Sequence, residues 1–400
     1  MKLEKLGNLI KITSGGTPLT SKREYYENGN IPWVKTGDLK VRHLTEVPDS
    51  ITKLGLENSS AKIFPPNTVL IAMYGATIGA CSILKVEAAT NQACAALLPN
   101  EKVNEEYLYF YLSSIKQGFI NKGVGGGQPN ISATILKETK FPLIPLSDQL
   151  HIANILSKAE ILIFQRKQSL AMLDDYLKST FLEMFGDNSK NDKGWKSITL
   201  IEACSNKHDV KCGPFGTQLG KSEYQIDGVP VWGIPQINSQ FKILPKDFVT
   251  NTKALELDEY SVVPFDIVMS RKGNVGKCSL FPKNFPKGII HSDVLRIRTD
   301  KKKMLPEFLL FQLKFSKHVE IQINGVSKGA IMAGINVGKL KHIIIQLPPL
   351  ELQSQFAQNV EKTEALKTYY QSSLQELENL YGSLSQRAFK GELTLNHAEE

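Results

Sequence analysis

A stretch of about forty residues occurs twice in this 400-residue chain, at a separation of 204 positions. Residues 145–186 align without a gap on residues 349–390, and both copies open on Pro-Leu-x-x-Gln. No proline and no glycine interrupts the first copy before Gly186, and only Gly382 interrupts the second. The sequence therefore predicts two long helices in matching register, and whatever precedes each helix is expected to be duplicated as well.

Apolar side chains recur in both copies at alternating steps of three and four residues. They are Ile152, Leu156, Ala159, Ile163, Leu170, Leu173, Leu177 and Met184, and then Phe356, Val360, Tyr370, Leu374, Leu377, Tyr381, Leu384 and Ala388. A repeat of 3.5 residues sustained over about five heptads is typical of a coiled-coil seam. Each helix is about 55 Å long at 1.5 Å per residue, and its obvious partner is the other copy. We expect an antiparallel coiled coil.

The segments before the two helices share landmarks that indicate two related β-rich domains. Short apolar runs bounded by Pro, Gly and Asn, such as residues 68–74 and 93–98, predict strands. Ile31-Pro32-Trp33 is echoed by Val229-Pro230-Val231-Trp232, and residues 66–79 return as 264–276 with Cys-Ser following both. We expect an α+β fold with these parts: a first domain (1–146), a long helix (147–186), a linker (187–194), a second domain (195–347), a long helix (348–393) and a tail (394–400).

The net charge of +8 lies in the two domains and not in the helices. Residues 195–346 hold 22 basic and 13 acidic residues, and residues 1–146 hold 16 and 12, whereas residues 347–400 have a net charge of −4. Basic globular units joined by acidic or near-neutral spacers suggest a polyanion, such as nucleic acid, bound at two places. Ordinary solvation of a charged surface is the alternative.

Other features of the sequence limit the class of protein. No apolar run approaches the ~20 residues of a membrane span, and the first residues lack the apolar core of a secretory signal. The five cysteines form no CxxC pair, and no two of the seven histidines have metal-ligand spacing. We expect a cytoplasmic protein with no membrane association, no disulfide framework and no metal.

Two motifs raise the question of catalysis. Asn30-Ile31-Pro32-Trp33 loosely resembles the Asn-Pro-Pro-Tyr motif of amino-methyltransferases, but Ile31 replaces the first proline and no glycine-rich cofactor loop is present. A buried Trp33 on a strand is the favoured interpretation. Residues 216–222 are one residue short of a phosphate-binding loop, so a turn with a solvated Lys221, or a lysine that reaches a DNA phosphate, fits better. The sequence predicts no enzyme.

Loops at the ends of predicted strands carry the candidate DNA contacts. Arg prefers guanine O6 and N7, and Asn or Gln prefers adenine N6 and N7, while glycine-rich turns let the backbone approach phosphates. A plain β-turn is the alternative at each position. The candidates are Thr17, Lys35, Tyr74, Asn91, Gln92 and Gln128 in the first domain, and Gln218, Lys221, Arg271, Lys272, His291, Ser292 and Lys328 in the second.

Several motifs together resemble the specificity subunit of type I restriction–modification enzymes, commonly called HsdS. They are Gly15-Gly16-Thr17-Pro18, Ile31-Pro32-Trp33, Gly-x-x-Ile-Gly at 75–79, the two Pro-Leu-x-x-Gln helices, Met184-Phe185-Gly186-Asp187 and the run from Arg387 to Leu393. The second domain departs from the Gly-Gly-Thr-Pro motif and has Gly213-Pro214-Phe215-Gly216-Thr217 instead. Because of that departure, the resemblance extends to the second domain as a whole but not to its individual DNA contacts.

The resemblance implies two target-recognition domains, each of which recognises one half of a bipartite, asymmetric site in double-stranded DNA. It implies that the helix pair sets the gap between the halves and docks two methyltransferase subunits, with restriction subunits in a larger complex. This subunit is then non-catalytic and binds no cofactor, and S-adenosylmethionine, ATP and Mg are expected on the partner subunits. Two alternatives stay open: a self-sufficient adenine DNA methyltransferase, and a coiled-coil scaffold that binds only proteins.

Overall fold

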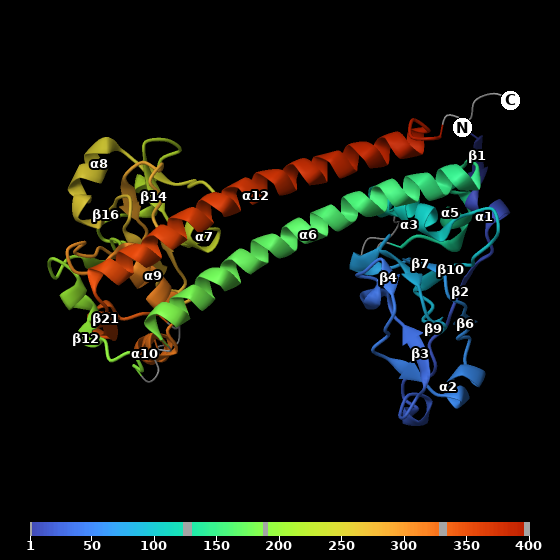
Figure 1. Ribbon diagram of the computed structural model, residues 1–400, viewed down its shortest axis with the longest axis horizontal. Coiled ribbons are helices and arrows are strands. Elements are labelled where there is room, and N and C mark those ends of the chain that lie inside the picture. The colour runs from blue at the N-terminus through green and yellow to red at the C-terminus, as the bar shows by residue number, and fades with distance from the viewer. Residues whose placement is uncertain (1, 123–129, 187–190, 328–333, 396–400) are drawn as a thin grey trace. The chain divides into compact units, whose positions relative to one another are not determined.

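The computed structural model describes residues 2–122, 130–186, 191–327 and 334–395. The chain divides into two compact units, Met1–Lys167 with Ser372–Glu400 (unit 1) and Gln168–Gln371 (unit 2). Each unit contains one β-rich domain and parts of both long helices, α6 (Leu146–Phe185) and α12 (Leu350–Lys390), as Figure 1 shows. The predicted α+β fold, with a long helix after each domain, is confirmed.

The first domain holds two sheets of mostly short strands and a two-stranded ribbon. One sheet has the order β2 (Ile12–Ser14), β10 (Cys94–Leu97), β7 (Val69–Ala72), β8 (Cys81–Leu84) and β4 (His43–Leu44). The other has the order β5 (Ser50–Ile51), β3 (Ile31–Val34), β9 (Ala88–Thr90) and β6 (Ile63–Phe64), and β1 (Lys2–Lys5) pairs with β11 (Lys140–Leu143). The helices are α1 (Leu6–Leu9), α2 (Lys53–Glu57), α3 (Glu105–Ser114), α4 (Lys116–Lys122) and α5 (Ala133–Glu138), with 3₁₀ turns η1 (Arg23–Tyr25), η2 (Thr36–Asp38) and η3 (Gly75–Thr77).

The second domain repeats this topology. One sheet has the order β13 (Val210–Cys212), β20 (Val294–Ile297), β17 (Ile267–Ser270) and β18 (Cys278–Leu280). The other has the order β15 (Phe248–Val249), β14 (Val229–Trp232), β19 (Gly288–Ile290) and β16 (Ser261–Val262), and β12 (Lys196–Thr199) pairs with β21 (Ile344–Leu347). The helices are α7 (Ile234–Asn238), α8 (Asn251–Glu256), α9 (Pro306–Phe315), α10 (Lys317–Ser327) and α11 (Val337–Leu340), with η4 (Leu200–Ala203), η5 (Lys221–Glu223) and η6 (Asp258–Tyr260).

The match between the two domains extends to strand direction. β3 and β9 pair in parallel through Trp33 and Ala89, as β14 and β19 do through Val231 and Ile289, while most other pairs are antiparallel. Among the described residues β4 has no counterpart in the second domain. The two domains are therefore two versions of one fold, which the scattered sequence landmarks had predicted.

Helix α3 joins the sheet of the first domain to the long helices. Its N-cap, Asn104, accepts hydrogen bonds from the backbone amides of Glu106 and Tyr107 at 3.1 and 3.0 Å. The helix lies between β7 and α6 (Figure 1), and its buried Tyr107 belongs to the same apolar core as Ile152 of α6. Burial of the face of α3 that carries Tyr107 attaches the first domain to α6.

The two long helices are antiparallel within each unit. In unit 1 the Lys167 ammonium lies 2.9 Å from the Glu378 carboxylate, and Leu156 shares a core with Ala388. In unit 2 the rings of Phe181 and Phe356 lie 5.5 Å apart. Residue numbers thus rise along α6 as they fall along α12. Every residue of the two predicted apolar stripes is buried or half-buried, which confirms the coiled-coil seam.

Two further observations concern the class of protein. No helix in the described part of the chain is long and apolar enough to cross a membrane. In the same residues no group of three or more His, Cys, Asp or Glu side chains is arranged to hold a metal ion, and the five cysteines are free.

Candidate nucleic-acid interface

The first domain has a pair of glycines, Gly15-Gly16, directly after β2, and this glycine segment packs against the end of β9. A Cβ atom on Gly15 would lie 1.9 Å from the carbonyl oxygen of Thr90, so only glycine allows this approach. The Gly16 amide donates to the same Thr90 oxygen at 2.9 Å, and the indole Nε1 of Trp33 donates to the Gly16 carbonyl at 3.1 Å. Trp33 is only 6% exposed. It supports the glycine segment from the core, in agreement with the buried-strand interpretation.

Four of the predicted contact residues lie near this glycine segment, at one end of the sheet. The Thr17 hydroxyl donates to Oε1 of Gln92, an exposed residue, so the donors on the Gln92 amide nitrogen are not used in this contact. Asn91 accepts from the amide of Ala93 through Oδ1 at 3.2 Å, so its side chain shapes the loop. Tyr74, which is 41% exposed, follows β7 beside this loop, because the Met73 amide donates to the Ala93 carbonyl. Gln92 and Tyr74 are the exposed members of this group, whereas Thr17 and Asn91 are half-buried.

Lys35 makes contacts inside the first domain. Its ammonium lies 2.7 Å from the Asp49 carboxylate and 5.4 Å from the centroid of the Trp33 ring. The side chain is still 43% exposed, so a phosphate can compete with Asp49 for it. Lys35 therefore fits a phosphate contact better than a base contact.

The second domain forms the equivalent segment after β13 with different side chains. A Cβ atom on Gly213 would lie 2.2 Å from the carbonyl oxygen of Ile290, which repeats the close approach of Gly15. Two residues further on, Phe215 stands where the first domain has Thr17. Its ring is 51% exposed. The same backbone device thus presents a hydroxyl in one domain and an aromatic ring in the other.

Arg271 and Lys272 follow β17 at the same end of the second domain. The Arg271 Nε donates to the carbonyl of Ile335 at 3.2 Å, and its guanidinium carbon lies 5.4 Å from the centroid of the Phe215 ring. The Lys272 ammonium lies 3.0 Å from the Asp293 carboxylate. Both cations are held by neighbours and remain partly exposed, so they are oriented before any ligand arrives.

His291 and Ser292 complete this cluster. The Asp293 amide donates to Nδ1 of His291 at 3.2 Å, which assigns Nε2 as the ring nitrogen that carries the proton when the imidazole is neutral. The backbone amide of Arg271 donates to the Asp293 carbonyl at 2.8 Å and so joins the two loops. His291 also lines a cavity of about 480 Å³ beside Ile234. Arg271, Lys272, His291 and Ser292 therefore lie together, as the sequence predicted for loops that end neighbouring strands.

The remaining candidates have other surroundings. Oε1 of Gln218 accepts from the Tyr260 hydroxyl at 3.0 Å and from the Phe215 amide, so Gln218 stabilises the turn. Lys221 is exposed on η5, and residues 216–218 form a turn, as expected for a segment that is not a phosphate-binding loop. Gln128 and Lys328 lie outside the described residues.

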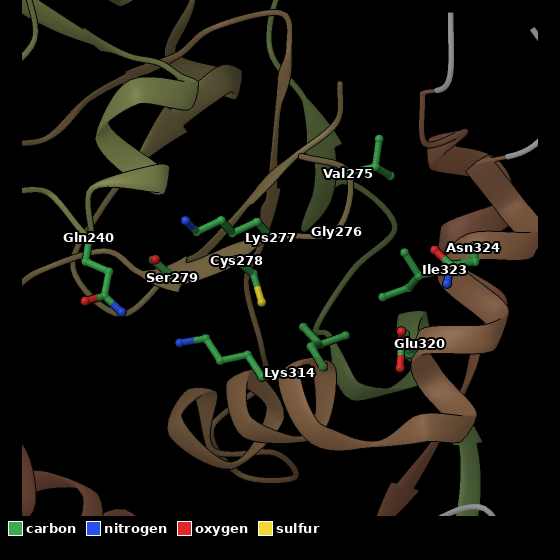
Figure 2. A pocket seen from close by; sticks show the side chains of 11 residues that line it. Gln240, Val275, Gly276, Lys277, Cys278, Ser279, Lys314, Glu320, Ile323 and Asn324 are labelled. Carbon is green, nitrogen blue, oxygen red and sulfur yellow. The ribbon is translucent and has the colours of Figure 1, made fainter. Parts of the chain in front are cut away.

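Two pockets next to these loops are lined partly by lysines. A groove of about 220 Å³ behind the Phe215 turn, the basic groove, is lined by Lys207, His208, Lys211, Tyr260 and Lys341 together with Phe215. Figure 2 shows a second pocket of about 350 Å³ behind the Arg271 loop, where Lys277 and Lys314 extend in the same direction, on the side of Gln240. The ammonium groups of Lys211, Lys277 and Lys341 are held by the Glu259 carboxylate, the Asn238 carbonyl and the Lys207 carbonyl.

The first domain is also tied to its helices by a half-buried network of ion pairs and hydrogen bonds. It consists of Arg42, His43, Lys85, Glu105, Glu106, Ser157 and Glu160. The Arg42 guanidinium lies 3.1 Å from the Glu160 carboxylate of α6 and donates to the Ser157 hydroxyl at 2.8 Å. Burial raises the pKa of Glu160, and the positive charge of Arg42 partly offsets that rise. This network fixes the orientation of the first domain on α6.

Sequence reasoning missed Phe215 and Asp293. Phe215 is apolar and was not considered a base contact, although its alignment with Thr17 was a usable signal. Asp293 directly follows His291-Ser292, but its contact with Lys272 joins residues that are 21 positions apart. Neither the role of Phe215 nor the ion pair between Lys272 and Asp293 could be derived from sequence spacing alone.

Comparisons with known proteins agree with these observations. The family model described as type I restriction modification DNA specificity domain matches residues 1–171 and 209–379, one copy for each domain. The MjaIX specificity subunit of Methanocaldococcus jannaschii is 29% identical over 190 residues, which cover 46% of this chain and 44% of the relative, so the chain spans less than half of that relative's length.

Two further relatives match most of the chain. The MjaVIII specificity subunit of the same organism is 23% identical over 377 residues, covering 90% of this chain and 85% of the relative. The solved structure of a type I restriction–modification S subunit from M. genitalium has a TM-score of 0.55 and 17% identity, with 97% of this chain and 96% of that chain covered. The likeness to the solved structure concerns the fold.

Proposed function

The chain belongs to the type I restriction modification DNA specificity domain family, and we propose that it is the subunit that selects the DNA sequence in such a system. Each β-rich domain recognises one half of a bipartite, asymmetric site in double-stranded DNA. The subunit itself catalyses no reaction. It acts in the cytoplasm, where the host DNA lies.

One observation carries this proposal: two domains of one topology present different side chains at equivalent loop positions. Thr17 corresponds to Phe215, Tyr74 to Lys272, and Gln92 to Ser292. A hydroxyl, an aromatic ring, an amide and an ammonium group make different contacts with base edges in the major groove. Two different halves of an asymmetric site are the expected targets of such a pair.

The helix pair sets the gap between the two half-sites. α6 and α12 contain 40 and 41 residues, and their seam continues through the helical part of each unit. A stiff spacer fixes the distance and the rotational phase of two DNA-binding domains along the duplex, as dimer geometry fixes half-site spacing in other DNA-binding proteins.

The helices also provide the surface for two methyltransferase subunits. Large apolar side chains are exposed outside the seam, and they occur at equivalent positions of the two copies. Leu162 and Leu366 are 49% and 38% exposed, and Tyr176 and Leu380 are 51% and 50% exposed. Duplicated apolar surfaces suit two copies of one partner. S-adenosylmethionine, ATP and Mg bind to the methyltransferase and restriction subunits in this proposal.

Sequencing of methylated adenines in a host that carries this subunit with its partners tests the proposal. The expected result is one split motif with a fixed gap, whose second half changes when residues 195–347 are exchanged for those of a relative. An unsplit motif, or one that ignores the exchange, contradicts it. Binding of S-adenosylmethionine by the purified chain alone supports a self-sufficient methyltransferase. Duplex binding that is absent at low salt supports a protein scaffold.

A further inference from the structure

Phe215 is an exposed aromatic residue on a turn whose backbone is tightly constrained. Its ring is 51% exposed, whereas the neighbouring Gly213 and Pro214 are buried. The Phe215 amide donates to the Gln218 side chain, which is itself held by Tyr260. A phenyl ring that is presented to solvent by a rigid turn suits contact with an apolar group on a ligand.

One face of the ring is already covered. The Arg271 guanidinium lies over it, with the carbon atom 5.4 Å from the ring centroid. An aromatic wedge that enters a base step is stacked on both faces, so this arrangement disfavours insertion between bases. The ring offers its edge and its other face, and these suit contact with the side of a base pair.

The neighbours of Phe215 indicate where on DNA that contact falls. Arg271 lies over the Phe215 ring and reaches the Ser292 carbonyl, and the polar atoms of Arg271, Ser292 and the adjacent His291 suit base edges in the major groove. Phe215 also lines the basic groove with Lys207 and Lys341, which suits backbone phosphates. Phe215 thus borders both a group suited to base contacts and a group suited to phosphate contacts.

We propose that Phe215 packs against the C5 edge of a pyrimidine in the major groove of the second half-site. This inference rests on the proposed function of the chain and identifies a specificity-determining residue of the second domain. The C5 edge carries a methyl group in thymine and a hydrogen in cytosine, and it is the apolar feature of the major groove. Phe215 then distinguishes thymine from cytosine where Arg271 recognises a neighbouring base.

Modified duplexes test this contact at the level of single atoms. The full chain, purified together with its methyltransferase subunits, is titrated with duplexes in which each thymine of the second half-site is replaced by uracil, one at a time. Each cytosine is likewise replaced by 5-methylcytosine. Loss of a buried methyl group weakens binding by about fourfold, and we expect one position to respond to this extent.

Variants then identify the side chain responsible. In Phe215→Ala and Phe215→Ser the response at that position is expected to disappear, whereas Phe215→Leu retains part of it. Modifications in the first half-site are expected to affect all four proteins equally. Two different replacements, Phe215→Ala and Phe215→Ser, are used so that a folding defect in one variant does not decide the result. Thermal unfolding of each protein shows whether it is folded.

The outcomes separate the inference from the proposal on which it rests. If the wild-type complex prefers its own site over a scrambled second half, but no modified pyrimidine loses its effect in Phe215→Ala and Phe215→Ser, the contact with Phe215 is wrong. If the wild-type complex shows no preference for its own site, the proposed function is wrong as well.

Discussion

Gln149 and Gln353, which lie 204 positions apart, make the same three hydrogen bonds in the two units. Gln149 accepts from the Asn104 amide at 2.9 Å and donates to the carbonyls of Lys102 and Ile144. Gln353 accepts from the Leu305 amide at 2.8 Å and donates to the carbonyls of Lys303 and Pro348. Both side chains are fully buried. The glutamine of each Pro-Leu-x-x-Gln motif thus joins the start of a long helix to the start of α3 or α9.

Replacement of either glutamine by leucine is expected to destabilise its own unit. Gln149→Leu leaves one amide and two carbonyl groups without their partner, at a cost of about 3 kcal/mol in the free energy of unfolding. Denaturant unfolding of Gln149→Leu and Gln353→Leu, followed by limited proteolysis, measures the loss and locates it. Gln358→Ala, at an exposed position of α12, is the control. Equal stability of Gln149→Leu and the control would contradict this role.

Removal of Arg42 is expected to produce a pH-dependent defect. In Arg42→Met the Glu160 carboxylate loses its cation, so its pKa rises further above the ordinary value of 4.5. A carboxyl group whose pKa is raised by folding imposes no penalty below about pH 4.5, and its penalty grows as the pH rises through the shifted pKa. Because the Glu160 side chain is 38% exposed, solvent screens its charge, and the pH-dependent part of the stability deficit should grow from pH 4.5 to about 1 kcal/mol at pH 8.

Chemical denaturation of wild type and Arg42→Met across this pH range measures the deficit. Arg23→Met serves as the matched control, because the Arg23 side chain is 88% exposed and its ion pair with Glu27 spans 4.0 Å. A deficit that does not change with pH would show that Arg42 acts by packing, for instance on the ring of Phe110, and not through Glu160.

Deletion of one heptad from each long helix is expected to shorten the gap between the half-sites. Removal of residues 170–176 and 374–380 keeps the seam in register and shortens each helix by about 10 Å. At 3.4 Å per base pair, the accepted gap should fall by about three base pairs. Mapping of methylated adenines measures the gap. An unchanged gap would contradict the role of the helices as a spacer, and deletion from one helix alone is the control for a broken seam.

Arg271→Ala and Gln92→Ala are expected to relax recognition in different half-sites. Loss of a bidentate base contact costs about 1–3 kcal/mol of discrimination, or about tenfold in preference between bases. Binding to duplexes with single base changes should show weaker discrimination only in the second half for Arg271→Ala and only in the first half for Gln92→Ala. A uniform loss over both halves would assign the residue to phosphate contact.

The fold could largely be predicted from the sequence because its strongest signals are local. The seam depends on a short period, so residues such as Ile152 and Phe356 mark it without any knowledge of the partner. The parallel pairing of Trp33 with Ala89 depends on residues 56 positions apart, and no local pattern reports it. The duplication of the domains was therefore visible in the sequence, whereas their strand order and strand directions needed the structure.

The candidate site was predicted residue by residue and not as an arrangement. Thr17 and Gln92 were both identified, but their hydrogen bond joins residues 75 positions apart. Phe215 escapes a sequence-based prediction because base recognition is predicted from hydrogen-bonding side chains, and an apolar ring has no hydrogen-bonding group. The DNA contacts of all these residues remain predictions.

Unit 1 is assembled from both ends of the chain, and this bears on the order in which a newly made chain can fold. The ring of Phe389 packs 5.4 Å from that of Tyr107, and the Leu395 amide donates to the Asp148 carboxylate. During translation the core of unit 2, residues 168–371, is complete before these partners leave the ribosome. The first domain is thus synthesised first but is the last to complete its packing. A chain released before α12 is made lacks the side chains that complete the core of that domain.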